Sequence, residues 1–414
     1  MNKKIRFLFI VILLTPLMAF VYSGIFKMPK YFSFSFIIAA FFIGIYFIGR
    51  YYKILKWHQF IILSILFAFY FNIWQQILDY QGIITEKHRL TKLFHQTKYF
   101  SFSFILLIIY NTKFSKSFIE NTIMIMKAIV IITSIVSVIQ VFNPTFLVLN
   151  IEDSDSFIAY KSLYTVRRSS IFGFDTPASL GLSFVPLLGV LIGYMIVNRQ
   201  KYAYLFLALG GISAFLSNTR FVMIGFVVIT FIFIFSRHNA LKAGFAYLFY
   251  ILIGIAFFSL FFDKIGYNVT DWFTYRLLNE GDIRYTTRYL AISNFIKFFP
   301  ESPIFGTGFL TDDIKTASNL VGSSHIHVGY LSHLVYYGLI GCILLFGSWY
   351  LMIRKLYKTA KSTNYYGSFI GFLTFFTAFA TMSQSVLFYS GIIFCFVFDK
   401  YYFDKIILNS STGE

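Results

Sequence analysis

Long apolar stretches separated by short polar segments recur along the whole chain. About twelve of them approach the length needed to cross a ~30 Å hydrocarbon layer, which takes roughly 20 mostly apolar residues in a helix. They lie near residues 7–26, 31–49, 57–78, 99–112, 118–142, 178–197, 202–217, 221–236, 241–262, 326–353, 367–386 and 388–403. The fourth and twelfth are short. Because a backbone in lipid must satisfy its own hydrogen bonds, the pattern predicts an all-α polytopic integral membrane protein.

The composition agrees with this class. Hydrophobic residues make up 58% of the 414 residues and charged residues only 13%, with a mean hydropathy of +0.72. A soluble domain carries about 25% charged residues. We therefore expect residues 1–414 to form a single transmembrane domain.

The lysines and arginines predict an orientation, because short cytoplasmic loops are enriched in them. If both termini are cytoplasmic, the basic residues fall in alternate connections on the inner side: Lys3, Lys4, Arg6, Arg50, Lys53, Lys56, Lys113, Lys116, Arg199, Lys201, Arg237, Lys242, Arg354, Lys355, Lys358, Lys361, Lys400 and Lys405. The net charge of +18 is thus mainly a topology signal. Its dispersal among the spans argues against nucleic-acid binding. The first span could alternatively be a signal peptide cleaved after Val21-Tyr22-Ser23.

Two connections are much longer than the others, residues 143–177 and 263–325. The predicted topology places both outside the cytoplasm, as two larger periplasmic loops. Long connections without structure of their own are usually functional. We therefore expect the chemistry on the outer face.

The second long loop contains a candidate amphipathic helix, IRYTTRYLAISNFIKFF. Its apolar stripe at helical spacing consists of Tyr285, Tyr289, Ile292, Ile296 and Phe299. Arg284 and Arg288 border the stripe, and Pro300, Pro303 and an FGTG turn end the helix. Such a helix can lie along the membrane surface with its arginines at phosphate depth, where they would meet a lipid substrate or ordinary phospholipids.

Other arginines stand at the same predicted face. Arg220 lies at a tight turn between two spans, and Arg167 with Arg168 precedes another span. Arginine near hydrocarbon is costly, so such a residue either snorkels or serves a site. The planar guanidinium group of arginine can donate two parallel hydrogen bonds to the oxygens of a diphosphate. Several arginines together would stabilise a departing diphosphate without a metal ion.

Three of the seven histidines, His325, His327 and His333, cluster at the start of the tenth predicted span. An imidazole with a pKa of about 6.5 can accept a proton from a sugar hydroxyl at neutral pH. Two alternatives stay open. The histidines could simply seek the membrane interface, or His325 and His327 could bind zinc together with Asp312 or Asp313.

Four of these segments resemble motifs of the O-antigen polymerase and O-antigen ligase superfamily of bacterial envelope proteins. They are RRSSIFGFDTPASLG with Arg168, Gly173, Phe174 and Pro177; LSNTRFVMIGF with Arg220; TTRYLAISNFIKFFPESPIFGTGF with Arg288, Gly306 and Gly308; and HVGYLSHLVYYGLIG with His327, Gly338 and Gly341. The resemblance covers roughly residues 160–350 in order. Val328 stands where the family usually has asparagine, which leaves His325 and His327 as alternatives for one role.

The resemblance implies a GT-C-like multi-helix fold with a groove at the outer leaflet. It implies that Arg168, Arg220 and Arg288 hold the undecaprenyl diphosphate of a lipid-linked oligosaccharide, with Arg167 and Arg284 beside them. His327 or His325 would orient or deprotonate the acceptor hydroxyl. The transfer would invert the anomeric carbon and need no metal, cofactor or nucleotide.

Polymerase members of the superfamily join lipid-linked repeat units, and ligase members move the polymer onto lipid A-core. The abundance of Phe, Ile, Lys, Asn and Tyr resembles polysaccharide-cluster polymerases, so we expect a polymerase in the bacterial inner membrane. Membrane lipid and a polysaccharide chain-length regulator would be its partners. A lipid-linked oligosaccharide flippase is the alternative of another class, although few charges lie inside the predicted spans and loop 263–325 fits a rocking transporter poorly.

Overall fold

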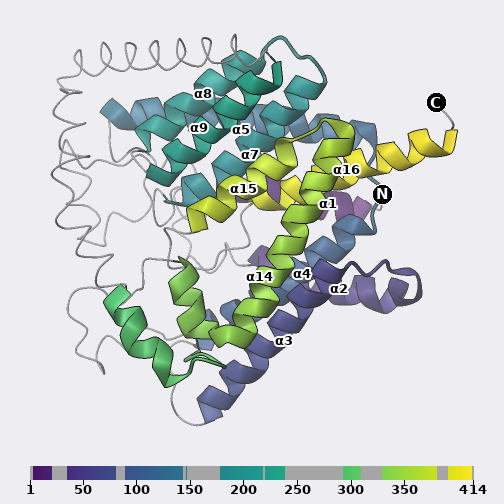
Figure 1. Ribbon diagram of the computed structural model, residues 1–414. Helices are drawn as coiled ribbons and strands as arrows, with labels where there is room; N and C mark the ends of the chain where they lie inside the picture. The colour runs from purple at the N-terminus through teal and green to yellow at the C-terminus, as the bar shows by residue number, and fades with distance from the viewer. Residues whose placement is uncertain are drawn as a thin grey trace.

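The structure is a computed structural model that describes residues 3–20, 35–80, 89–142, 146, 178–217, 220–237, 292–308, 329–379 and 390–412. Every regular element within these ranges is a helix (Figure 1). The predicted all-α class is therefore confirmed for the described part of the chain.

The helices follow the predicted apolar stretches closely. Span 241–262 lies outside the described residues, and each of the other predicted spans coincides with a helix. The two stretches predicted as short are longer in the structure, since the fourth helix begins at Arg89 and the last ends at Thr412. The bounds are α1 (Lys3–Phe20), α2 (Ser35–Tyr51), η3 (Tyr52–Ile54), α3 (Gln59–Tyr80), α4 (Arg89–Tyr110), α5 (Lys116–Phe142), α7 (Ala178–Val197), α8 (Ala203–Leu216), α9 (Arg220–Arg237), a helix at 292–298, η7 (Phe299–Glu301), α14 (Gly329–Thr363), α15 (Gly367–Phe379) and α16 (Ser390–Thr412).

Three helices in the described part are long and apolar enough to cross a membrane: Gln59–Leu78, Lys116–Phe142 and Gly329–Thr363. Shorter apolar helices accompany them at Thr97–Tyr110, Ser183–Val197, Ala203–Leu216, Val222–Ile234 and Gly367–Phe376. This set confirms a membrane protein with several helices of spanning character. The total of about twelve crossings remains a prediction.

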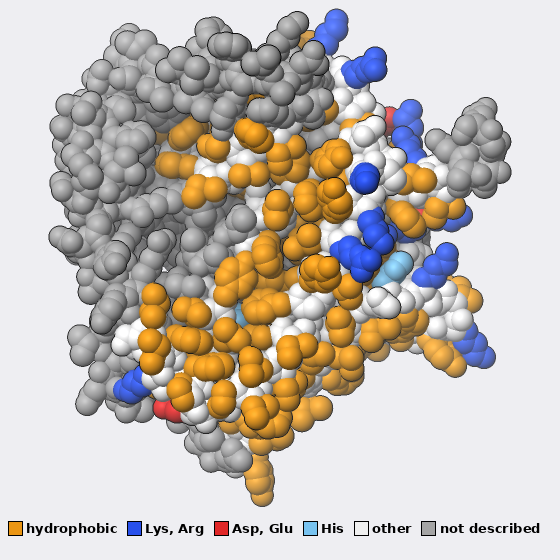
Figure 2. Space-filling model, viewed as in Figure 1, with side chains coloured by type: hydrophobic (Ala, Val, Ile, Leu, Met, Phe, Trp, Pro, Cys, Tyr) orange, Lys and Arg blue, Asp and Glu red, His pale blue; other side chains and the backbone are white. Residues whose placement is uncertain are grey.

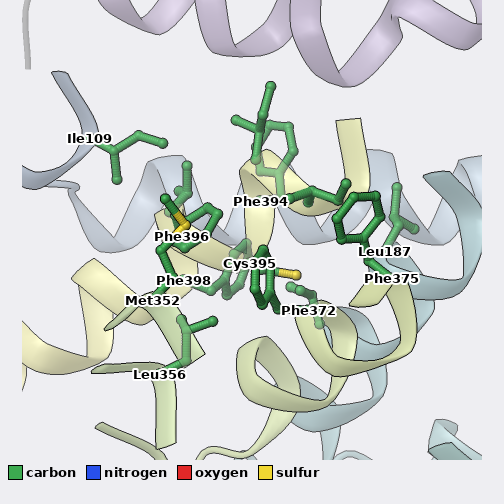
Figure 3. Close-up of a cluster of buried hydrophobic side chains, with 14 of the residues drawn as sticks. Ile109, Leu187, Met352, Leu356, Phe372, Phe375, Phe394, Cys395, Phe396 and Phe398 are labelled. Carbon is green, nitrogen blue, oxygen red and sulfur yellow. The ribbon is translucent and has the colours of Figure 1, made fainter. Parts of the chain in front are cut away.

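The helices pack in neighbouring pairs. Helix α14 lies against α3, α2 against α4, α5 against α8, and α7 contacts both α15 and α16 (Figure 1). Side chains from α4, α7, α14, α15 and α16 meet in a buried cluster that includes Met352, Phe372, Cys395 and Phe396 (Figure 3). Both cysteines are buried and free, as expected for packing residues inside spans.

Glycines allow α7 and α15 to pack closely against each other. Gly189 and Gly193 of α7 face Gly367 and Gly371 of α15, and both pairs have a spacing of four residues. A Cβ atom on Gly193 would lie only 2.4 Å from the Cα atom of Gly367. Small residues at this spacing let two helix backbones approach closely. Such close packing matters in a membrane, because the hydrophobic effect does not drive helices together in lipid.

Three of the lysines predicted to share one side of the membrane, Lys56, Lys355 and Lys400, lie near one another around His58. The backbone N–H of Lys56 donates to Asn111 Oδ1 at 2.7 Å, which joins two separate turns. Lys355 Nζ lies 5.2 Å from the ring centroid of Tyr110, whose hydroxyl donates to Asp399 at 2.7 Å. Figure 2 shows lysines and arginines concentrated near the two chain ends and apolar side chains over the middle. We call the end around Lys56, Lys355 and Lys400 the cationic end.

Candidate functional site

Most residues of the predicted site lie outside the described part of the chain. This applies to Arg167, Arg168, Arg284, Arg288, His325 and His327. Arg220 is the first residue of α9, at the predicted turn between two apolar helices. The described segments that directly follow Arg288 and His327 nevertheless show how the fold holds these two motifs.

The segment after Arg288 forms a helix at 292–298, followed by η7. Ile292 and Ile296 of the predicted apolar stripe are 47% and 65% exposed, so this part of the stripe faces away from the protein core. Phe295 and Phe299 stack with their ring centroids 5.0 Å apart and pack on the core instead. An outward apolar stripe is what a helix lying in the membrane interface would present to lipid.

The FGTG sequence ends this helical segment as predicted. Pro300 lies within η7, and Gly306 and Gly308 adopt φ values of 79° and 75°. Glycine occupies this left-handed region without the steric penalty that other residues have. The chain therefore turns sharply at these two glycines.

Helix α14 is interrupted where the turn around Gly306 packs against it. Gly338 has φ 60° and ψ −171°, which are not helical values. Backbone groups on either side of the interruption bond to the turn instead of to their own helix. These bonds are Thr307 N–H to Val335 O at 2.8 Å, Gly308 N–H to Tyr336 O at 3.0 Å, Leu339 N–H to Pro303 O at 2.9 Å and Ile340 N–H to Ile304 O at 3.2 Å. The turn thus satisfies groups that a broken helix would leave unpaired in a water-poor interior.

The two motif glycines are in direct backbone contact. A Cβ atom on Gly306 would lie 2.4 Å from the backbone nitrogen of Gly338, and a Cβ atom on Gly338 would lie 2.4 Å from the nitrogen of Gly306. Either side chain would push the two segments apart. We call residues 302–308 together with residues 335–340 the glycine junction.

Two buried ionisable side chains lie near this junction. His333 is fully buried, and its Nδ1 lies 2.8 Å from the carbonyl oxygen of Gly329. Because a carbonyl only accepts, Nδ1 carries the proton and Nε2 keeps a lone pair. Lys98 of α4 is 4% exposed, lies 4.9 Å from the ring centroid of Tyr99, and is close enough to His333 for charge repulsion. The hydroxyls of Tyr99 and Tyr337 are 2.5 Å apart and join α4 to α14.

These buried residues change the sequence-based picture. The sequence placed His333 just inside the tenth predicted span, and the structure shows its side chain fully buried. Lys98 was missed because it immediately precedes the predicted span 99–112. The signal that could have identified Lys98 is its position at the start of a long apolar run, because a charged side chain in hydrocarbon costs free energy.

Metal binding receives no support from the described part of the chain, where no group of three or more His, Cys, Asp or Glu residues could hold an ion. The residues of the zinc alternative, His325, His327, Asp312 and Asp313, lie outside that part.

Residues 204–346 match a family model described as O-Antigen ligase. No curated protein matches the sequence. The matched region runs from α8 through the glycine junction into the middle of α14, so it contains three of the four motifs on which the resemblance rests. The resemblance to the O-antigen polymerase and ligase superfamily is confirmed, and it indicates a function of that type in a membrane.

Proposed function

We propose, from the O-antigen ligase family region at residues 204–346, that this protein is a glycosyltransferase that polymerises lipid-linked oligosaccharide repeats. Its donor is an undecaprenyl-diphosphate-linked oligosaccharide, and its product is an O-antigen or similar surface polysaccharide. The reaction takes place at the periplasmic face of the inner membrane.

The glycine junction is the observation that carries this proposal. It joins, backbone to backbone, the segment that follows Arg288 to the segment that follows His327. Arg288 precedes the described helix at Ile292 by four residues. His327 precedes α14 at Gly329 by two residues. The junction begins 14 residues after Arg288 and eight residues after His327, and by joining the two segments it supports a shared site for arginine and histidine.

In the proposed mechanism, Arg168, Arg220 and Arg288 bind the diphosphate of the donor, with Arg167 and Arg284 beside them. His327, or His325 in its place, accepts the proton of the acceptor hydroxyl. The hydroxyl oxygen attacks the anomeric carbon and inverts it, while the bond from that carbon to the diphosphate oxygen breaks. The arginines stabilise the charge that develops on the departing diphosphate.

Ligation is the second candidate, because the matching family model is described as O-Antigen ligase. A ligase would use the same donor and the same bond-breaking step. It would differ in its acceptor, which is lipid A-core instead of another lipid-linked repeat. A polysaccharide chain-length regulator would be a partner of the polymerase only.

Deletion of the gene separates these functions on a gel of surface polysaccharide. A polymerase deletion is expected to leave core bearing a single repeat, and reintroduction of the gene restores the ladder. Core without any repeat would instead indicate a ligase or a flippase. An unchanged ladder would contradict the proposal.

Substitution at the site tests the assigned residues. His327→Ala and Arg288→Ala should each abolish the ladder, because general-base catalysis alone contributes about 10²–10⁴-fold. Immunoblots of the membrane fraction would check that both variants accumulate. Full ladders from both variants would refute the residue assignments.

A further inference from the structure

Helix α3, which lies outside the family match, contacts both halves of the glycine junction. The Tyr70 hydroxyl lies 2.6 Å from the carbonyl oxygen of Phe305 in the turn and 2.8 Å from that of Tyr337 in α14. A hydroxyl has one proton, so it donates to one carbonyl at a time or is shared between the two. Tyr70 thus bridges the turn and the interrupted helix.

Trp74 makes a second contact one helical turn further along α3. Its indole Nε1–H donates to the carbonyl oxygen of Gly306 at 2.9 Å. Its ring also stacks on Phe305, with centroids 5.1 Å apart and planes 27° from parallel. Trp74 therefore fixes both the position and the tilt of the turn.

The bonded carbonyls occur where the backbone is irregular. Tyr337 directly precedes the non-helical Gly338, and Phe305 and Gly306 belong to the turn. Carbonyls at such places need partners from elsewhere in a water-poor interior. Tyr70 and Trp74 supply these partners from a third, continuous helix.

We infer that Tyr70 and Trp74 are positioning residues for the proposed glycosyl transfer. They set the angle between the turn and the interrupted helix, and through it the geometry of the segments that carry Arg288 and His327. The inference rests on the proposed function. Transfer requires reacting groups to be held closely, and a displacement of about 1 Å can cost ~10²-fold in rate.

A matched control exists on the same pair of helices. The Ser348 hydroxyl of α14 donates to the carbonyl oxygen of Phe60 in α3 at 2.9 Å, and Ser348 is buried. This bond also joins α14 to α3, but it lies away from the glycine junction. Ser348→Ala therefore removes a comparable interhelical bond without disturbing the turn.

The kinetic experiment uses full-length protein in lipid nanodiscs, with the lipid-linked oligosaccharide extracted from the deletion strain as substrate. Tyr70→Phe loses only the hydroxyl donor, and Trp74→Phe loses the indole N–H and the five-membered ring while it keeps an aromatic ring beside Phe305. Each should lower kcat by about 10–100-fold with little change in KM, because positioning acts on the reaction step. Ser348→Ala should keep the wild-type kcat.

A cysteine pair reports on the junction itself. Ile304→Cys with Ile340→Cys, in a Cys342→Ala, Cys395→Ala background, joins two residues whose backbones bond at 3.2 Å. Disulfides form when Cα atoms lie about 4.4–6.8 Å apart, so this pair should cross-link on mild oxidation. Adding Tyr70→Phe should slow the cross-linking, whereas adding Ser348→Ala should not.

The outcomes are distinguishable. If the wild-type protein extends no substrate, the proposed function fails and the inference fails with it. If the wild-type protein is active while Tyr70→Phe and Trp74→Phe keep its kcat, only the positioning inference is overturned. An equal loss of kcat in Ser348→Ala would also overturn it, since any bond between α3 and α14 would then suffice.

Discussion

The glycine junction and the cationic end are held together by different kinds of contact. At the junction, residues 302–308 and 335–340 bond through their backbones, with Gly306 and Gly338 too close to admit a side chain. At the cationic end, Lys355 lies over Tyr110 and Phe403, and Lys400 pairs with Asp404. Backbone contacts leave no rotamer freedom, whereas long lysine side chains can rearrange. The comparison suggests that the junction serves positioning and the cationic end serves orientation in the membrane.

The largest effect is expected from adding a methyl group at the junction. Gly338→Ala or Gly306→Ala introduces a Cβ atom 2.4 Å from backbone and a left-handed residue that costs roughly 1–2 kcal/mol before any clash. We expect a lower thermal unfolding midpoint in detergent and loss of the polysaccharide ladder. Gly49→Ala is the control, because a Cβ atom there meets nothing within 4 Å. Wild-type stability and a full ladder for Gly338→Ala would contradict the described junction.

A smaller effect should separate Lys98, which is buried, from Lys355, which is half-buried. Lys98 lies beside His333 below the junction, and Lys355 lies at the cationic end. If the buried Lys98 side chain helps to stabilise the departing diphosphate, Lys98→Met should lower transfer by about tenfold or more, since electrostatic stabilisation is strongest at low dielectric. Lys355→Met should leave transfer unchanged and affect only stability. Equal activity of the two variants in nanodiscs would remove Lys98 from the candidate site.

The smallest effect is expected at the surface of the cationic end. Lys116 and Glu120 approach to 3.8 Å with side chains 79% and 51% exposed. Exposed pairs of this kind contribute about 0–1 kcal/mol. Lys116→Ala should therefore leave both the unfolding midpoint and the ladder as in the wild type. A clear loss of activity would show that the cationic end does more than orient the chain.

The sequence predicted the apolar helices and the turn at Gly306 and Gly308 because both depend on local signals. Hydropathy defines a span, and glycine marks a left-handed position. The contact between Gly306 and Gly338 was not predictable, since residues 32 positions apart in sequence meet only through tertiary packing. The burial of His333 and Lys98 was missed for the same reason. Neither the stacking of Trp74 on Phe305 nor the bridge made by Tyr70 leaves a pattern in the sequence.

The proposed function requires the glycine junction to lie on the periplasmic side of the membrane. Labelling of single cysteines can test this. Glu301 lies beside the glycine junction, and Lys358 lies in the last turns of α14. Both residues are exposed, and each would be replaced singly by cysteine. Both variants would be made in a Cys342→Ala, Cys395→Ala background and treated with a membrane-impermeant thiol reagent in spheroplasts. The account predicts that Glu301→Cys is labelled in intact spheroplasts and Lys358→Cys only after lysis. Labelling of Lys358→Cys in intact spheroplasts, with Glu301→Cys protected until lysis, would place the junction in the cytosol and contradict the account.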